Sequence, residues 1–453
     1  MTIQVSTVPE VGNLGTQTKV DRSAYLTGLL HLRPELTEAT KYLQDVRDRA
    51  TARVQELAIP STRDEEWRFT DLSPLLEVQF SAPNSSSTVS PSEIQSFALP
   101  ESDHSRLVVL NGVYSPGLSD ASGLPPDVFV GNLSDAYQSS LIGDKIPQYF
   151  AKQQGAEETF TALNTACLTD AVVIWVPRNQ LLGTPIHVLF VSTGVQPAAI
   201  AHPRCLVVAE SGSSLTLIEE YVSLAEGSYF NNAVTEVWLQ SNAQVDHTRV
   251  QRENVDSFHI GKTAVSQARD SRYACHAVSL GSAIARHNLE VYQLGEQTET
   301  TLNGLTLIAG RQVSDTHSAI AYTKPHSSSR QLHKCIVDDR AHAVFNGKVF
   351  VPKAAQLTDA GQLSKNLLLS SKARIDTKPQ LEITADNVKC SHGATVSQLD
   401  QDEVFYLQSR GIDEASSRKL LVYAFAYEVI REIPIHSLRD TLAVTVRAQQ
   451  SHV

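Results

Sequence analysis

The sequence predicts a mainly β protein in which a β core lies between two helical end regions. Between roughly residues 205 and 400, short runs of β-forming residues begin about every ten to twenty residues, and no amphipathic helix interrupts them. A βαβ fold would need helical crossovers in this stretch, and a hairpin-built sandwich usually has more Asn-Gly or Asp-Gly turns. The pattern therefore favours a stacked solenoid, the parallel β-helix, with a β-sandwich as the alternative.

The first region, residues 1–80, is expected to be helical. Apolar residues recur at three- and four-residue steps from Tyr42 to Leu57. Thr37 is a suitable N-cap for this helix, and Pro60 should end it.

A polar stretch and a linker should connect this helix to the β core. Within the polar stretch, Trp67 is expected to be a packing anchor and not a ligand contact. Residues 81–104 are predicted to be a linker, because residues 81–91 are rich in Ser and Pro and almost free of apolar side chains. The β core should then occupy residues 105–397.

The last region, residues 398–453, is expected to be helical again. Asp402 should open a short helix, Asp413 should cap a longer one, and Ser437 should cap the last. Pro434 should close the longer helix, in which Leu420–Tyr427 carry no charge. A helix that is apolar all round needs cover on every side. The β core can supply one side, and either a partner protein or the flanking helices can supply the other.

The composition excludes several classes of protein. The 453 residues include 38 Lys and Arg against 49 Asp and Glu, a net charge of −11, which argues against a nucleic-acid binder. Nothing approaches the ~18 consecutive apolar residues of a membrane span. The opening residues MTIQVSTVPEVGN lack the basic and apolar parts of a secretory signal. We therefore expect a cytoplasmic protein without a membrane or nucleic-acid partner.

The five cysteines stand at positions 167, 205, 275, 335 and 390, too far apart for a C-x-x-C pair. Their odd number disfavours a disulfide framework, and structural zinc needs two short-spaced ligand pairs. Cysteine stands beside histidine three times, at Cys275-His276, His333-x-Cys335 and Cys390-x-His392. For each pair alone, a buried free thiol is the simplest interpretation.

Two motifs resemble catalytic elements only superficially. Gly261-Lys262-Thr263 would end a phosphate-binding loop, but Asp256 occupies the position that needs the first glycine. Asp338 and Asp339 could be the two carboxylates of a β-helical polysaccharide hydrolase. Adjacent residues of a strand point to opposite faces, so a solvated turn is the favoured interpretation.

Cys390-Ser391-His392 is the strongest candidate site. Residues i and i+2 of a strand share a face, so the thiol and the imidazole could reach one ion. Thiolate and imidazole are ligands for iron–sulfur clusters or zinc. Two ligands make half a site, so full coordination would need a second chain, and a purely structural pair remains the alternative.

At this stretch the chain resembles a known family. Lys389–Val396, followed by Phe405–Ile412, closely resembles the C-terminal signature of SufD-type members of the SufB/SufD family, which act in iron–sulfur cluster assembly. Further matching segments are Glu66-Trp67-Arg68, Ser329–Lys334, Val344–Gly347, Asn366–Leu369 and Asp376–Ile383. The resemblance is strong over about 285–433 and looser elsewhere.

Two features place the resemblance with SufD and not with SufB. SufB-type proteins typically read E-H-E-A where this chain has Cys390–Gly393, and they carry a sulfur-accepting cysteine near the position of Ser364-Lys365-Asn366. This chain has no cysteine there. It departs from many SufD-type proteins at Tyr322, where some have His, and at Ser397, where many have Gly.

The resemblance implies a right-handed parallel β-helix flanked by N-terminal and C-terminal helical regions. It also implies a non-catalytic scaffold subunit that pairs with SufB through the β-helices and binds the ATPase SufC through the C-terminal helices. Leu421, Phe425 and Val429, spaced four apart, are the expected SufC-docking residues. A nascent iron–sulfur cluster would lie between the two chains, with His392 as the ligand from this chain and Cys390 as an auxiliary thiol. No nucleotide should bind this chain, and homodimerisation in isolation is left open.

Two other classes remain as alternatives. A β-helical carbohydrate-active enzyme would use Asp338 and Asp339, and a free-standing metal or iron-storage module would bind metal without a partner.

Overall fold

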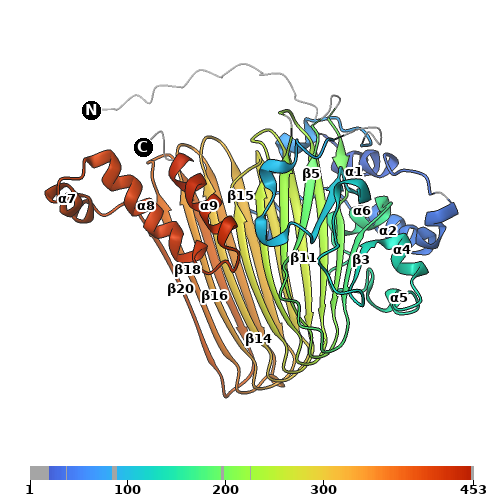
Figure 1. Ribbon diagram of the computed structural model, residues 1–453. Coiled ribbons are helices and arrows are strands. Elements are labelled where there is room, and N and C mark those ends of the chain that lie inside the picture. The colour runs from blue at the N-terminus through green and yellow to red at the C-terminus, as the bar shows by residue number, and fades with distance from the viewer. Residues whose placement is uncertain (1–19, 37, 84–88, 195–197, 225, 450–453) are drawn as a thin grey trace, which may run out of the picture.

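The computed structural model describes residues 20–36, 38–83, 89–194, 198–224 and 226–449, and Figure 1 shows their arrangement. Two long sheets face each other along the molecule, with helices at both ends of the chain. Within each sheet the long strands pair in parallel with strands two places away in the sequence, as β10 does with β8 and β12. This pairing confirms a mainly β protein with a parallel β-solenoid and excludes the antiparallel sandwich.

The first sheet has the strand order β2-β1-β5-β8-β10-β12-β14-β16-β18-β20. Its strands are β1 (Arg106–Leu110), β2 (Val113–Tyr114), β5 (Ile186–Ser192), β8 (Ser214–Ser223), β10 (Gln244–Arg252), β12 (Arg272–Ser279), β14 (Glu299–Ile308), β16 (Ser328–Val337), β18 (Asp359–Leu368) and β20 (Lys389–Ser397). β1 and β2 form an antiparallel hairpin at the N-terminal end of the sheet.

The second sheet has the order β19-β17-β15-β13-β11-β9-β7-β4-β3, and β6 also pairs with β9. Its strands are β3 (Phe129–Asn132), β4 (Val172–Val176), β6 (Ile200–Ala201), β7 (Arg204–Ala209), β9 (Phe230–Leu239), β11 (Phe258–Gln267), β13 (Ile284–Gln293), β15 (Val313–Tyr322), β17 (His342–Val351) and β19 (Arg374–Ile383). Each coil of the solenoid contributes one strand to each sheet.

One corner of successive coils is formed by a residue in the left-handed backbone region. These residues are Asn242, Asp270, Gln297, His326 and Leu357, with φ between 58° and 64°. Each lies between a strand of the second sheet and the next strand of the first sheet. Because only the conformation repeats and the residue type does not, the coil period is nearly invisible in the sequence.

The interior of the solenoid is mainly apolar but contains a buried polar group. Stacked side chains such as Val188, Val237 and Val291 form its core. Among them, the Glu219 carboxylate lies 3.1 Å from Nε2 of His247, whose Nδ1 lies 2.9 Å from the hydroxyl of Tyr273. Each of these polar atoms therefore has the partner that a buried polar group requires.

The N-terminal helices pack on the second sheet towards the N-terminal end of the solenoid. The helices up to residue 167 are α1 (Arg22–His31), α2 (Gln44–Gln55), α3 (Ser73–Leu76), α4 (Leu133–Gln138), α5 (Ile146–Tyr149) and α6 (Thr159–Cys167). Short 3-10 helices are η1 (Glu38–Leu43), η2 (Glu65–Trp67), η3 (Gln95–Phe97), η4 (Pro100–Ser102) and η5 (Pro116–Leu118). Buried residues of α1, α2 and α6 pack together with Phe230 and Phe258 of the second sheet.

The N-terminal region differs from the sequence expectation in its details. α1 was not expected, and the expected long helix begins as the 3-10 helix η1 and ends at Gln55, five residues before Pro60. Thr37, the expected N-cap, lies outside the described residues. In the described part of residues 81–104, Ile94 and Leu99 are buried against the first sheet, so this segment is packed onto the core.

The C-terminal helices lie on the outer face of the first sheet. They are α7 (Gln401–Ser409), α8 (Glu414–Ile430) and α9 (His436–Gln449). α8 and α9 bury Val422, Val429 and Leu438 against strands β14 to β18, and α7 projects away from the body (Figure 1). Asp413 caps α8 as expected, by accepting from the backbone N–H of Ser416.

Ser437 was expected to be the N-cap of the last helix, and this is wrong. α9 already begins at His436, and Ser437 instead donates its backbone N–H to Glu101 at 2.9 Å. The contact joins the C-terminal helix to the segment before β1. Among the described residues, no helix is long and apolar enough to span a membrane.

Candidate functional site

The last coil of the solenoid, formed by β19 and β20, ends both sheets. Beyond these strands the sheets have no further neighbour within the described part of the chain, so each presents an unpaired edge. Side chains that would be buried in an inner coil are open here, including Ile383 at 37% and Val396 at 50% exposed. An exposed edge with apolar side chains is typical of a surface that pairs with another chain.

Cys390 and His392 both lie on β20, on the same face of the strand. Their partners in register on β18 are Ala360 and Gln362, which are buried in the solenoid interior. Cys390 packs against the inner core and is half-buried, and burial raises the pKa of its thiol. His392, two residues further along the same inner face, is exposed.

The other four cysteines are buried. Burial raises the pKa of Cys275 and of Cys335 to about 12, so neither forms a thiolate readily. The pairs Cys275-His276 and His333-x-Cys335 are therefore buried thiols, as the sequence indicated. Cys390 is the one cysteine of the five that a partner molecule can reach.

The described residues contain no group of three or more His, Cys, Asp or Glu side chains that could hold a metal ion. Cys390 and His392 thus offer two donors on one strand and no third. This arrangement fits half of a coordination site that a second chain completes.

The segment Ser329–Lys334 of β16 makes side-chain contacts on both the outer and the inner face of the first sheet. Arg330 pairs with Asp359 of β18 at 2.8 Å on the outside. On the inside, the imidazole of His333 stacks on Phe345 with 4.5 Å between ring centroids. A Cβ at Gly304 would come within 2.1 Å of His333 Nδ1, so glycine is needed there to make room for the ring.

Lys334 fastens helix α8 to the sheet. Its ammonium donates to the carbonyl of Phe425 at 2.9 Å, pairs with Glu428 and lies 4.0 Å from the centre of the Phe425 ring. The Lys334 side chain is only 2% exposed, and burial lowers its pKa. Lys365 of β18 approaches the same Glu428 at 3.5 Å.

One of the three expected docking residues on α8, Val429, needs a correction. Val429 is fully buried against the chain's own β-solenoid, and Phe425 is half-buried beneath the Lys334 contact. Val429 is therefore covered by the chain's own sheet, whereas Leu421 and Phe425 are both half-buried. Large side chains that remain exposed in this region include Phe405 at 70% and Leu420 at 45%.

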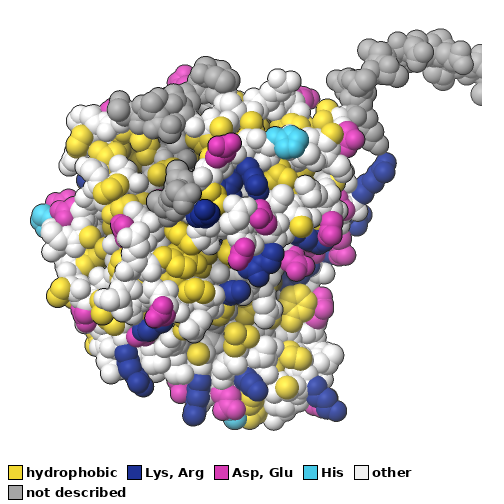
Figure 2. Space-filling model, turned by 90° about the vertical axis from the view of Figure 1, so that its right-hand side faces the viewer, with side chains coloured by type: hydrophobic (Ala, Val, Ile, Leu, Met, Phe, Trp, Pro, Cys, Tyr) yellow, Lys and Arg dark blue, Asp and Glu magenta, His cyan; other side chains and the backbone are white. Residues whose placement is uncertain are grey.

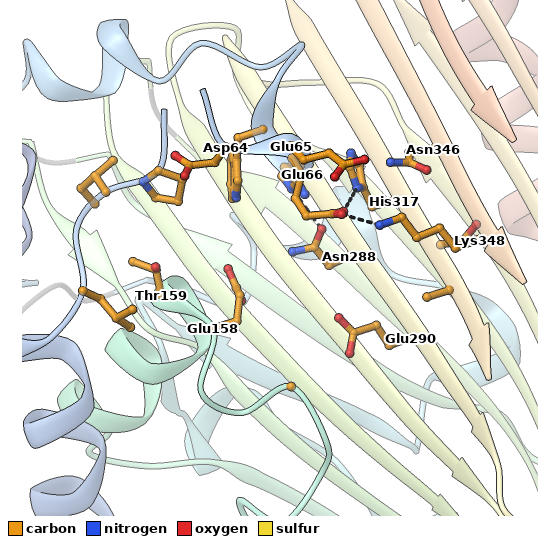
Figure 3. Close-up of a pocket in the computed structure, with 18 of the residues that line it drawn as sticks. Asp64, Glu65, Glu66, Glu158, Thr159, Asn288, Glu290, His317, Asn346 and Lys348 are labelled. Atoms are coloured by element: carbon orange, nitrogen blue, oxygen red, sulfur yellow. Dashed lines mark hydrogen bonds and ion pairs between the residues drawn. The ribbon is translucent and has the colours of Figure 1, made fainter. Parts of the chain in front are cut away.

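A cavity of about 780 Å³ lies on the outer face of the second sheet, away from His392 (Figure 3). Its walls come from residues 56–67, the start of α6, and strands β13, β15 and β17. Lining side chains shown in Figure 3 include Glu66, Glu158, Asn288, His317 and Lys348.

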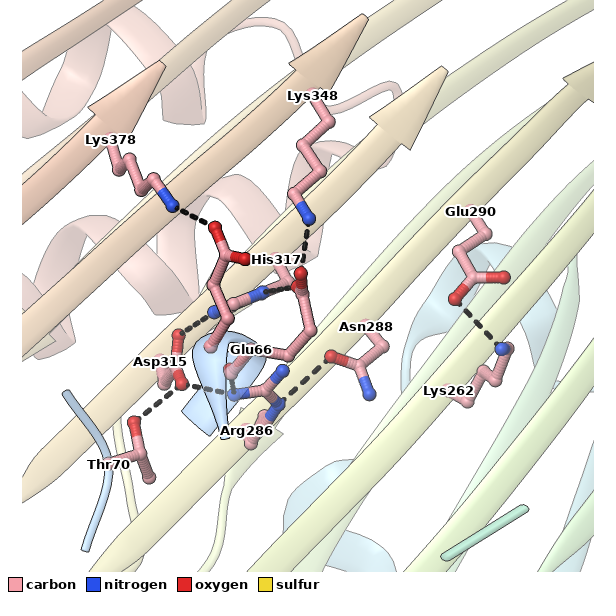
Figure 4. A network of polar contacts seen from close by, with 11 residues as sticks. Glu66, Thr70, Lys262, Arg286, Asn288, Glu290, Asp315, His317, Lys348 and Lys378 are labelled. Carbon is pink, nitrogen blue, oxygen red and sulfur yellow. Dashed lines mark hydrogen bonds and ion pairs between the residues drawn. The ribbon is translucent and has the colours of Figure 1, made fainter. Parts of the chain in front are cut away.

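We call residues 61–70, which border this cavity, the N-terminal strap. Figure 4 shows how the strap is held on the sheet by a network of polar contacts. Lys378 pairs with Glu65 at 2.7 Å, and Lys348 pairs with Glu66. His317 lies between the carboxylates of Glu66, at 3.3 Å, and Asp315, at 3.0 Å.

Arg286 completes the attachment of the strap. Its guanidinium binds Asp315 at 2.6 Å and the Glu66 carbonyl at 2.7 Å, and it lies 3.8 Å from the centre of the Trp67 ring. Trp67 is 5% exposed, which confirms it as a packing anchor. The Glu65 and Glu66 carboxylates are both paired with lysines of the second sheet, so this part of the cavity wall holds the strap on the sheet.

The two superficial motifs have structural roles. Gly261-Lys262-Thr263 lies inside the regular strand β11, and Lys262 pairs with Glu290 at 2.8 Å, so no phosphate loop forms there. Asp338 and Asp339 lie in the turn between β16 and β17, where Asp339 has a φ of 51°. This confirms the expected turn.

Figure 2 views the N-terminal end of the molecule and shows acidic, basic and hydrophobic side chains interspersed on that face. The last coil lies at the opposite end of the solenoid. There the described residues combine an open edge, exposed apolar side chains and the Cys390–His392 pair.

Comparison with known proteins covers nearly the whole chain. Residues 190–425 match the family described as the SUF system FeS cluster assembly, SufBD core domain. Residues 32–188 match the SufBD protein N-terminal region. The boundary between the two lies within the first coils of the solenoid.

Relatives in several organisms agree with this match. An iron–sulfur cluster assembly SufBD family protein of Synechocystis is 48% identical over 411 residues, covering 88% of this chain and 89% of that protein. The iron–sulfur cluster assembly protein SufD of Escherichia coli is 33% identical, with 86% and 88% covered. SufD of Bacillus subtilis is 27% identical, with 96% and 98% covered. This chain therefore belongs to the SufBD family of iron–sulfur cluster assembly proteins and has SufD proteins among its relatives.

Proposed function

We propose that this chain is a non-catalytic scaffold subunit of a Suf-type assembly complex. It pairs with a SufB partner through its last coil and binds the ATPase SufC through its C-terminal helices. A nascent iron–sulfur cluster, the cargo of the complex, is held between the two chains with His392 as the ligand from this side. Cys390 is an auxiliary thiol on the same strand face.

The observation that carries this proposal is the open edge strand β20 with its two donors. The edge provides unpaired backbone groups for a partner strand, and the donors lie where that partner would meet them. Neutral imidazole adds no negative charge to a cluster, and clusters with His in place of Cys have raised potentials. A single imidazole also holds iron less firmly than a full thiolate set, which suits a cluster that must be passed on.

The proposed SufC contact uses the exposed parts of α7 and α8. Phe405 and Tyr406 on α7 are 70% and 57% exposed, and Leu420 on α8 is 45% exposed. α7 extends away from the solenoid, so its apolar side chains are not covered by the β core (Figure 1). Exposed clusters of this kind mark protein interaction sites.

The test is reconstitution of the complex with SufB and SufC under anaerobic conditions. His392→Ala should leave assembly intact, measured by size-exclusion chromatography, and should abolish cluster formation, measured by visible absorbance. Cys390→Ala should have a smaller effect, because burial disfavours its thiolate.

His392→Gln serves as the control for packing, since it keeps a polar side chain of similar reach without an imidazole. If His392 only packs at the end of the solenoid, His392→Gln should form clusters normally. A His392→Ala complex that assembles and transfers clusters at the normal rate would overturn the ligand assignment. Failure of the wild-type chain to join SufB and SufC would overturn the scaffold role.

A further inference from the structure

A row of side-chain amides crosses the inner face of the last coils. Gln331 of β16 donates from Nε2 to the hydroxyl of Ser318 at 2.7 Å. Gln362 of β18 donates from Nε2 to Oε1 of Gln331 at 2.8 Å. Both glutamines are buried, at 8% and 4% exposed, so the two bonds fix which way each amide faces.

The row ends in an acceptor without a partner. Oε1 of Gln362 is buried and makes no hydrogen bond to any described residue. Buried polar atoms in native proteins are nearly always hydrogen-bonded. The Gln362 oxygen is therefore available to accept a hydrogen bond from a donor that reaches it.

His392 is the next residue in the row. Gln331, Gln362 and His392 are aligned in register on β16, β18 and β20. Neighbouring strands lie about 4.8 Å apart, and residues in register on parallel strands share a face. The alignment thus brings the imidazole of His392, which can donate an N–H, next to Gln362 from the β20 side.

The opposite sheet makes room for this amide. A Cβ at Gly347 would come within 2.0 Å of Gln362 Nε2, so a side chain there would displace the amide. Gly347 belongs to the segment Val344–Gly347 that carries the family resemblance. Glycine at position 347 therefore leaves the space that the Gln362 amide occupies.

We propose that Gln362 is a positioning residue for His392, a role that rests on the proposed function of His392 as a ligand. Gln362 Oε1 accepts a hydrogen bond from the protonated ring nitrogen of His392, which fixes the tautomer and the orientation of the ring. The other ring nitrogen is left unprotonated and faces the open end of the solenoid. Ligand histidines are commonly held in this way, by a carbonyl or carboxylate that accepts from the second ring nitrogen.

The test measures the tautomer of His392 directly in the full-length chain. The protein is labelled with 15N-histidine, and the ring nitrogen shifts are recorded at about pH 9, where imidazole is neutral. His392 is identified by the signal that disappears in His392→Asn. We expect one dominant tautomer in the wild type and a mixture of tautomers in Gln362→Met. Gln362→Glu should again show a single tautomer, because its carboxylate can accept the same hydrogen bond from the ring N–H.

Asn366→Leu is the matched control. Asn366 lies on the same face of β18, is buried and also has an unpaired amide oxygen, but its partner in register is Val396, which has no donor. This variant should leave the His392 tautomer unchanged. An unchanged tautomer in Gln362→Met, or an equal change in Asn366→Leu, would overturn the proposal.

A second measurement separates this proposal from the function on which it rests. In the complex with SufB and SufC, Gln362→Met should retain iron about tenfold less well, and Gln362→Glu should recover most of the loss. If His392→Ala forms clusters normally, the ligand role of His392 fails, whatever the tautomer result. If His392→Ala abolishes clusters but Gln362→Met changes neither tautomer nor iron retention, the positioning role alone is wrong.

Discussion

Lys334 shows how a charged residue can be both buried and stable in a strand. Its stem crosses the interface between β16 and α8, and its ammonium finds a carbonyl, a carboxylate and an aromatic ring there. A buried charge is tolerated only when such partners replace water. The contact ties the helix that carries the proposed partner surface to the sheet that carries β20.

Removing the charge of Glu428 should destabilise the protein more than replacing Lys334 by an apolar residue. Glu428→Gln leaves a buried ammonium without its counter-ion, and we expect it to lower the free energy of unfolding by about 2 kcal/mol. Lys334→Met fills the same space with an apolar chain and should cost less. Urea unfolding of both variants at pH 7 tests which of them loses more free energy of unfolding. A larger loss for Lys334→Met would show that the ion pair contributes little beyond packing.

The N-terminal strap is an element held mainly by charged contacts. Residues 61–70 cross strands β13 to β19, so they connect the N-terminal region to the last coil. A hydrogen bond from His317, followed by the contact with Lys348, lowers the pKa of Glu66 from 4.5 to about 2. A carboxylate whose pKa is lowered on folding stabilises the fold above its unfolded pKa and loses this contribution as the pH falls.

Glu66→Gln should therefore have a pH-dependent effect. At pH 7 we expect a loss of about 1 kcal/mol, the upper range for half-exposed ion pairs. The difference from the wild type should shrink as the pH falls from about 4.5 towards 2, because the wild-type carboxylate then becomes protonated. Unfolding by urea at a series of pH values measures this, with the more exposed Glu65→Gln as the control. A constant difference across the pH range would assign the effect to packing.

At the scale of the whole molecule, the two ends of the solenoid differ. The N-terminal helices cover the first coils, whereas the last coil and α7 are exposed within the described part of the chain. The two proposed partner surfaces lie at the same end of the molecule but on different elements (Figure 1). They should therefore respond independently to mutation.

Val396→Asp and Phe405→Asp test this independence. Each would bury an unpaired charge in one interface, and we expect a loss of binding of at least tenfold at that interface. Val396→Asp should prevent pairing with SufB and leave SufC binding intact, and Phe405→Asp should do the reverse, as measured by pull-down with purified partners. Leu181→Asp, at a position that is 69% exposed near the start of β5, is the control. Equal loss of both partners in either variant would contradict separate surfaces.

The sequence by itself determined the order of regions and the candidate pair on β20. Strand-forming runs, the absence of amphipathic helices and the Asp413 cap are local signals, so they can be read without knowing the fold. The two-residue period of a strand likewise placed Cys390 and His392 on one face. The family segments were recognisable, but the purpose of Gly304, Lys334 and Gly347 was not.

Only the tertiary structure decided which residues meet across coils. Gln362 lies one coil before His392, and the corner residues that set this period share a backbone conformation but not a residue type, so no sequence repeat reveals the alignment. Val429 looked free for a partner because helix periodicity does not say which neighbour covers an apolar face. The strap contacts, such as that between Glu65 and Lys378, join residues far apart in the chain. Contacts of this kind arise from stacking the coils, and local sequence cannot specify them.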